Sequence, residues 1–131
     1  RRWPARSRKL CASSNARRIF HGFARPSGWP MLVLIAGIGA PVTEELLLRG
    51  FLLPALARSR LGFWGAAAVT SGLFAVAHAW QYAPVLLIPI FVIGMLLAWA
   101  LRRTGSLYVT IGLHALNNAI ALFTLWMWPP A

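Results

Sequence analysis

Acidic residues are almost absent from this sequence. Glu44 and Glu45 are the only two in 131 residues, against 13 Lys and Arg. Charged residues make up 11% of the chain and hydrophobic residues 59%, whereas ordinary soluble domains are about 25% charged and about 45–50% apolar. This shortage of charge argues against a soluble domain and indicates an integral membrane protein.

Cysteine is equally scarce, and the excess of positive charge is uneven. Cys11 stands alone, so an intrachain disulfide is excluded. A formal net charge of +11 would suit nucleic acid, but eight of the 13 basic residues precede Ser27. The others, Arg49 excepted, lie at the ends of apolar segments, where membrane proteins place them. We therefore expect membrane lipids as partners and no nucleic acid.

Four apolar segments follow the basic tail over residues 1–28, which we interpret as a membrane-surface or disordered region. Arg pairs and Pro/Gly turns separate them. The pattern predicts one all-α domain over residues 29–131, an integral membrane helical bundle of about four to five transmembrane helices. The segments cover approximately residues 29–57, 62–80, 84–101 and 106–128.

Details within these segments give further expectations. The first segment forms either one tilted or broken helix or two shorter ones. In the second, Ala67, Ser71, Ala75 and Ala79 recur every four residues and should form a ridge for close helix packing. In the third, Pro89 is expected to kink the helix.

Arginines predict the orientation of the bundle. The turns with Arg58/Arg60 and Arg102/Arg103 should share one side, which positive-inside bias makes cytoplasmic. The basic tail favours the same side for its own end, and both can be satisfied only if the first segment passes twice or re-enters.

The two glutamates should differ in role. In a helix Glu45 and Arg49 stand at i and i+4, the favourable order for an ion pair. Glu44 is rotated by about 100° and cannot easily share that arginine. One carboxylate is then neutralised in place and the other left free. The alternative is a purely structural pair beside a solvated glutamate.

Two more polar pairs lie one helical turn apart on other segments, Phe74 with His78 and His114 with Asn118. If all these groups meet in one cavity, they suit hydrolysis. A carboxylate in a low-dielectric pocket can act as a general base on water. One histidine can hold that water, and the second histidine with an amide can stabilise an oxyanion.

Other chemistries stay open. Glu44, His78 and His114 could bind zinc instead, although the usual helical pair of histidines at i and i+4 is absent, so we rank a metal second to no cofactor. Each histidine alone could be a packing residue. Glu and His chains in membranes also serve as proton or ion relays.

Three motifs in this order resemble those of the CPBP family, the CAAX proteases and bacteriocin-processing enzymes also called the Abi family. They are Pro41-x-x-Glu44-Glu45-x-x-x-Arg49-Gly50, Phe74-x-x-x-His78 and Gly112-x-His114-x-x-x-Asn118. The resemblance implies an all-helical intramembrane endopeptidase that works without metal. It further implies that Glu44 and His78 activate water, that His114 and Asn118 form the oxyanion hole, and that Glu45 and Arg49 orient the site.

The resemblance also bears on substrate and location. It implies hydrolysis of a membrane-associated protein or peptide, lipidated or not, and the Arg- and Ala-rich composition suits a bacterial cytoplasmic membrane. Family members commonly have more spanning helices than this chain. The alternative functions are a non-catalytic membrane immunity or interaction protein that retains the fold, and an intramembrane proton or ion relay.

Overall fold

The computed structural model describes residues 28–127, and predictions for the basic tail lie outside this range. Every regular element between residues 28 and 127 is a helix, which confirms the all-α prediction. Within this described range, three helices are long and apolar enough to cross a membrane, and a fourth apolar helix is shorter. The long ones are Trp29–Ala57, Pro84–Thr104 and Leu107–Met127, and the shorter one is Gly62–Ala77.

The first helix runs without a break from Trp29 to Ala57, but its winding changes along its length. Two π-helical stretches, whose turns are wider than those of an α-helix, alternate with three α-helical ones. In chain order they are α2 (Trp29–Leu32), η1 (Val33–Gly39), α3 (Ala40–Glu45), η2 (Leu46–Leu52) and α4 (Leu53–Ala57).

Prolines explain where the winding changes. Each π-helical stretch ends two residues before a proline, η1 before Pro41 and η2 before Pro54. A proline inside a helix has no N–H to donate, and its ring crowds the carbonyl one turn earlier. A wider turn relieves that crowding, so the helix continues through both prolines instead of breaking.

The continuity of the first helix corrects one expectation. At about 1.5 Å per residue its 29 residues span about 44 Å, more than the ~30 Å hydrocarbon core, so the helix is long enough to tilt. Its Gly28 end and its Arg58/Arg60 end are therefore opposite, and the double pass proposed from charge does not occur.

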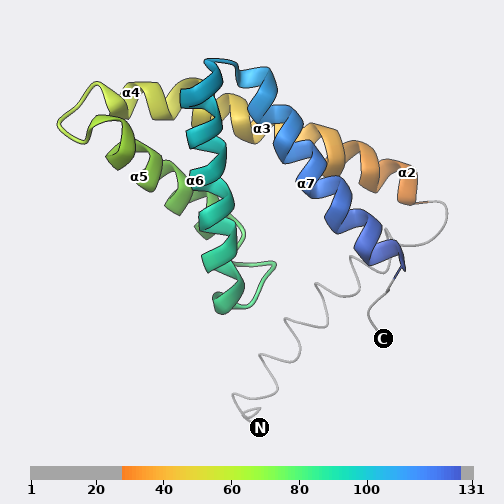
Figure 1. Ribbon diagram of the computed structural model, residues 1–131. Helices are drawn as coiled ribbons and strands as arrows, with labels where there is room; N and C mark the ends of the chain where they lie inside the picture. Colours follow the sequence, from red (N-terminus) through yellow and green to blue (C-terminus); the bar gives the residue numbers. More distant parts are fainter. Residues whose placement is uncertain (1–27, 128–131) are drawn as a thin grey trace, which may run out of the picture.

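The other helices pack against different parts of the first helix (Figure 1). Helix α7 (Leu107–Met127) packs along η1 and α3, and α5 (Gly62–Ala77) packs against α4. Helix α6 (Leu87–Thr104) lies against both α5 and α7. The end of α3 thus lies where the partners of the first helix change, and this is where Glu44 and Glu45 are found.

Small residues allow α5 to pack closely, as the sequence predicted for most of the ridge. Ala67, Ser71 and Ala75 are buried. Ala79 is exposed and lies beyond the helix, which ends at Ala77 rather than near residue 80. Before the next helix, Pro84 drives Ala83 to extended backbone, so a turn separates α5 from the residues that follow.

The third apolar segment also differs from prediction at one point. Pro89 lies in the first turn of α6, where backbone N–H groups have no helical partner in any case, so it does not kink the helix. A short 3-10 turn, η3 (Pro84–Leu86), precedes it. Helix α6 ends at Thr104, and its C-cap Gly105 has a φ of +66°, the left-handed conformation that favours glycine at this position.

Arginines gather at one end of the bundle, as predicted. The Arg102 guanidinium lies 4.9 Å from the Phe63 ring centroid and 5.2 Å from that of Trp64. Both aromatic residues begin α5, directly after the turn that holds Arg58 and Arg60. The end of α6 and the start of α5 therefore share one side of the molecule.

Candidate active site

A buried ion pair lies at the centre of the site, at the junction of α3 and η2. Arg49 Nη1 donates a hydrogen bond to Glu45 Oε1 over 2.9 Å, and both side chains have no exposed surface. The pair expected from the i,i+4 spacing is therefore present. Arg49 Nη2 donates a second hydrogen bond of 3.0 Å to the Gly94 carbonyl on α6.

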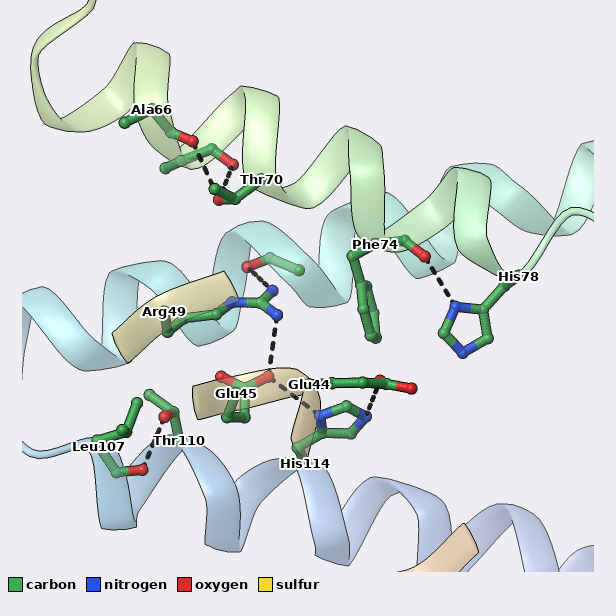
Figure 2. Close-up of polar contacts among 12 residues, drawn as sticks. Glu44, Glu45, Arg49, Ala66, Thr70, Phe74, His78, Leu107, Thr110 and His114 are labelled. Atoms are coloured by element: carbon green, nitrogen blue, oxygen red, sulfur yellow. Dashed lines mark hydrogen bonds and ion pairs between the residues drawn. The ribbon is translucent and has the colours of Figure 1, made fainter. Parts of the chain in front are cut away.

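His114 extends this pair from α7 (Figure 2). Its Nδ1 lies 3.0 Å from Glu45 Oε1, the same oxygen that Arg49 binds. Because a carboxylate accepts, this contact assigns the proton of a neutral His114 ring to Nδ1. Nε2 faces the other glutamate, 3.7 Å from Glu44 Oε2. We refer to Glu45, Arg49, His114 and the Gly94 carbonyl as the buried network.

Glu44 stands at the edge of this network and is less enclosed. A third of its side chain is exposed (33%), yet its buried Oε2 has no hydrogen-bond partner. A shallow, largely open hollow of about 570 Å³ on the surface of the first helix, which we call the groove, has this carboxylate in its lining. Besides Glu44, its lining residues are Leu34, Ile35, Ile38, Gly39, Ala40 and Thr43.

His78 lies directly after the end of α5. Its Nδ1 is 2.8 Å from the Phe74 carbonyl oxygen, an acceptor that likewise assigns the ring proton to Nδ1 and leaves Nε2 with a lone pair. Figure 2 shows His78 and His114 on either side of the Glu44 side chain. Within residues 28–127 the hydrogen bond of the His78 ring goes to Phe74 and not to Glu44.

The Phe74 ring joins these groups by packing. Its centroid is 4.8 Å from the His78 ring and 5.3 Å from the His114 ring, with both histidines near edge-on geometry. The Arg49 guanidinium lies 5.0 Å from the same centroid, within range of a cation–π contact. Phe74 thus sets the spacing of two histidines and the arginine.

Asn118 binds the backbone of the first helix. Its Nδ2 donates a 2.8 Å hydrogen bond to the Ala36 carbonyl in η1. In the π-helical register Ala40 donates to Ile35, five residues earlier, so the next donor for Ala36 would be Pro41, which has none. Asn118 satisfies the carbonyl that this proline leaves free, and one N–H of its amide stays available.

The alternative zinc set is not assembled. Among residues 28–127 no three His, Cys, Asp or Glu side chains are close enough to hold one metal ion. Glu44 and His114 lie close together, but the His78 ring makes its polar contact elsewhere.

Sequence reasoning missed Gly94. Segment 84–101 contains none of the three motifs, yet Gly94 supplies the carbonyl that accepts from Arg49. A Cβ built at Gly94 would lie 2.9 Å from both Cβ and Oγ of Ser71, so the site needs a glycine there. The available signal was the single glycine in that bulky apolar segment, opposite the small-residue ridge of α5.

An apolar helical bundle that gathers two glutamates, an arginine and two histidines defines a membrane protein with a buried polar site. Residues 26–120 match the type II CAAX prenyl endopeptidase Rce1-like family, and the chain belongs to this family of proteases. The match includes every site residue named above, and it agrees with the resemblance found from the motifs. The apolar helices and the family together make the chain an integral membrane protein.

One relative is an Escherichia coli protein described as an uncharacterized 24.3 kDa protein. It is 36% identical over 95 residues, which cover 70% of this chain and 43% of that protein. The chain thus spans less than half the length of this relative. No solved structure matches the chain.

Proposed function

We propose that this chain is the catalytic core of an intramembrane endopeptidase that cleaves a peptide bond in a membrane-associated protein or peptide. The observation that carries the proposal is the contrast between the adjacent glutamates. Oε2 of each glutamate has no hydrogen-bond partner, but Oε1 of Glu45 is engaged by Arg49 and His114. The Glu44 side chain is instead one-third exposed and borders the groove. A carboxylate without such partners, at a hollow on the surface, suits a general base.

In the proposed reaction, a water oxygen attacks the carbonyl carbon of the scissile bond, and Glu44 takes one proton from that water. The lone pair on His78 Nε2 accepts the other hydrogen and holds the water in line. This role needs a neutral ring with its proton on Nδ1, which the bond to the Phe74 carbonyl supports.

His114 then shares the proton. At 3.7 Å the pair of Glu44 Oε2 and His114 Nε2 is slightly too long for a hydrogen bond and too close for an intervening water. A small rotation lets protonated Glu44 donate to Nε2. The imidazolium that forms is stabilised by Glu45 on its other nitrogen. Its new Nε2–H, with the remaining N–H of Asn118, then stabilises the oxyanion.

Collapse of the tetrahedral intermediate completes the reaction. The carbonyl re-forms and the C–N bond breaks. The proton taken from water passes from His114 through Glu44 to the leaving amine. The products are a carboxylic acid and an amine, with the added water fully accounted for. None of these steps uses a metal.

The geometry supports hydrolysis over the two alternatives. A proton relay would string its groups across the bilayer, whereas Glu44, Glu45, Arg49 and His114 converge through contacts of 3.7 Å or less. A non-catalytic protein would have no use for an unpaired carboxylate, which is expensive in a membrane. Both lipidated and unlipidated peptides suit an apolar groove as substrates. We further propose that the protein lies in a bacterial cytoplasmic membrane.

The test is cleavage of a peptide library, with and without attached lipid, by the protein in detergent. Wild type should cleave a subset of peptides, and Glu44→Gln should not. Asn117→Ala is the control, because Asn117 is exposed on α7 beside the site. A parallel reaction contains a metal chelator, and loss of cleavage there would favour the zinc alternative. Equal cleavage by wild type and Glu44→Gln would contradict the proposal.

A further inference from the structure

The buried network depends on a backbone atom that no motif identifies. Arg49 Nη2 donates to the Gly94 carbonyl, and this bond ties the first helix to α6. Arg49 in turn holds Glu45, and Glu45 holds His114. We infer that Gly94 is a positioning residue for the catalytic groups, an inference that rests on the proposed function.

The lack of a side chain at Gly94 is what allows this contact. A Cβ there would lie 2.9 Å from Ser71 Cβ, 2.9 Å from Ser71 Oγ and 3.1 Å from Ser71 Cα. Real Cβ contacts essentially never come under 3.0 Å, so any larger residue must push α6 away from α5. Ser71 is fully buried and cannot move aside into solvent.

A shift of α6 acts first on Arg49. Its guanidinium is held by three elements at once, by Glu45 at the end of α3, the Gly94 carbonyl on α6 and the Phe74 ring on α5. Loss of the α6 contact leaves an N–H of a fully buried cation without an acceptor, so the guanidinium reorients to recover one.

That reorientation reaches His114 because one oxygen is shared. Glu45 Oε1 accepts from both Arg49 and His114, and the other oxygen of Glu45 has no partner. When the guanidinium turns, the carboxylate turns with it, and the His114 ring loses the contact that fixes its tautomer. The distance from His114 Nε2 to Glu44 then changes although neither residue has been altered.

Gly72 provides a matched control for Gly94. It lies on α5 directly beside Ser71, and a Cβ built on it meets nothing within 4 Å. Gly72→Ala and Gly94→Ala therefore make the same chemical change on neighbouring helices, and only the second disturbs the contact with Ser71. Ser71→Gly removes the two closest clashing atoms and should relieve Gly94→Ala.

The experiment measures the histidine ring nitrogens by NMR on isotope-labelled protein in detergent, where the chain has three histidines to assign. Wild type should show His114 with a hydrogen-bonded proton on Nδ1. Gly94→Ala should shift this signal, Gly72→Ala should not, and Gly94→Ala with Ser71→Gly should restore it. This measurement needs no turnover, so it stands even where wild type cleaves no peptide and the proposed function fails.

Cleavage kinetics supply the second measurement. Gly94→Ala should lower kcat by up to about 100-fold, the usual effect of misplacing catalytic groups by an ångström, with little change in KM. Arg49→Lys removes the bond to Gly94 by another route. In the Arg49→Lys background, Gly94→Ala should have little further effect on kcat. If the two losses in kcat multiply instead, Gly94→Ala acts only by loosening helix packing and not through Arg49.

Each outcome either supports the inference about Gly94 or overturns it. A shifted His114 signal that Ser71→Gly restores supports the inference. An unchanged His114 signal in folded Gly94→Ala overturns it. Should Gly94→Ala alone not fold, the double variant must fold and show the wild-type signal. Failure of the double variant to do so also overturns the inference.

Discussion

The first helix presents a closed side and an open side to its surroundings, and its two adjacent glutamates take one each. On the closed side Glu45 has no exposed surface, and one oxygen is bound by Arg49 and His114. On the open side Glu44 is one-third exposed at the end of an apolar groove. A rotation of about 100° per residue separates the two environments.

The difference shows how apolar surroundings can hold one carboxylate as a paired structural charge and leave another able to accept a proton. Burial of an unpaired charge costs several kcal/mol, about as much as a typical enzyme needs from a general base. Arg49 and His114 offset that cost for Glu45, so its charge is structural. Glu44 lacks such partners and keeps its capacity to take a proton.

The largest expected effect comes from removing the available charge. Glu44→Gln keeps the size and polarity of the side chain but removes the base. Peptide cleavage should fall by about 10²- to 10⁴-fold, the usual contribution of a general base. The melting temperature in detergent should stay near that of wild type, because Glu44 makes no hydrogen bond through its buried oxygen.

The buried charge of Glu45 should show the opposite pattern, a loss of folding stability. Glu45→Gln leaves the buried Arg49 guanidinium without a counter-charge, which costs about 3–5 kcal/mol of folding free energy. Denaturation in detergent followed by helical signal measures this loss. The comparison between the glutamates breaks down if Glu45→Gln is stable but inactive while Glu44→Gln unfolds, since their roles would then be reversed.

Much of this arrangement could be predicted from the sequence, because it depends on short-range spacing. The ion pair of Glu45 and Arg49 follows from helix geometry alone, and the four apolar segments follow from hydropathy. The placement of arginines on one side, at the start of α5 and the end of α6, also follows from where charged residues flank the apolar segments. These features need no knowledge of how the helices pack.

What could not be predicted depends on contacts between distant residues. The contact of His114 with both glutamates, across 69 residues in one case, depends on how α7 lies along α3. The bond from Arg49 to Gly94 requires the close approach of α6 to Ser71. The π-helical turns could have been suspected from Pro41, but hydropathy does not report backbone winding.

The open side can be examined through substrate affinity. Ile38 lines the groove and is 55% exposed, so a bound apolar substrate should cover it. Ile38→Ser removes roughly 1 kcal/mol of apolar contact and should raise KM about fivefold while kcat stays unchanged. Ile120→Ser is the matched control, because Ile120 is 60% exposed on α7 and does not line the groove. Equal effects of both variants would show that substrate does not use the groove.

The smallest expected loss of folding stability concerns the backbone beneath the open side. Asn118→Ala leaves the Ala36 carbonyl without a donor, at a cost of about 1 kcal/mol in folding free energy, typical of hydrogen bonds between helices in membranes. Asn117→Ala, an exposed neighbour, should cost less. Pro41→Ala gives residue 41 an N–H that can reach the same carbonyl.

The two changes should therefore not add. Pro41→Ala alone should be destabilising through lost packing, since Pro41 is fully buried. In the Asn118→Ala background it should be less so, because the restored N–H replaces the lost amide. The measurement is a double-mutant cycle of unfolding free energies in detergent. Additive losses would mean that Asn118 and Pro41 do not share the Ala36 carbonyl, and the wide turn before Pro41 would then need another cause.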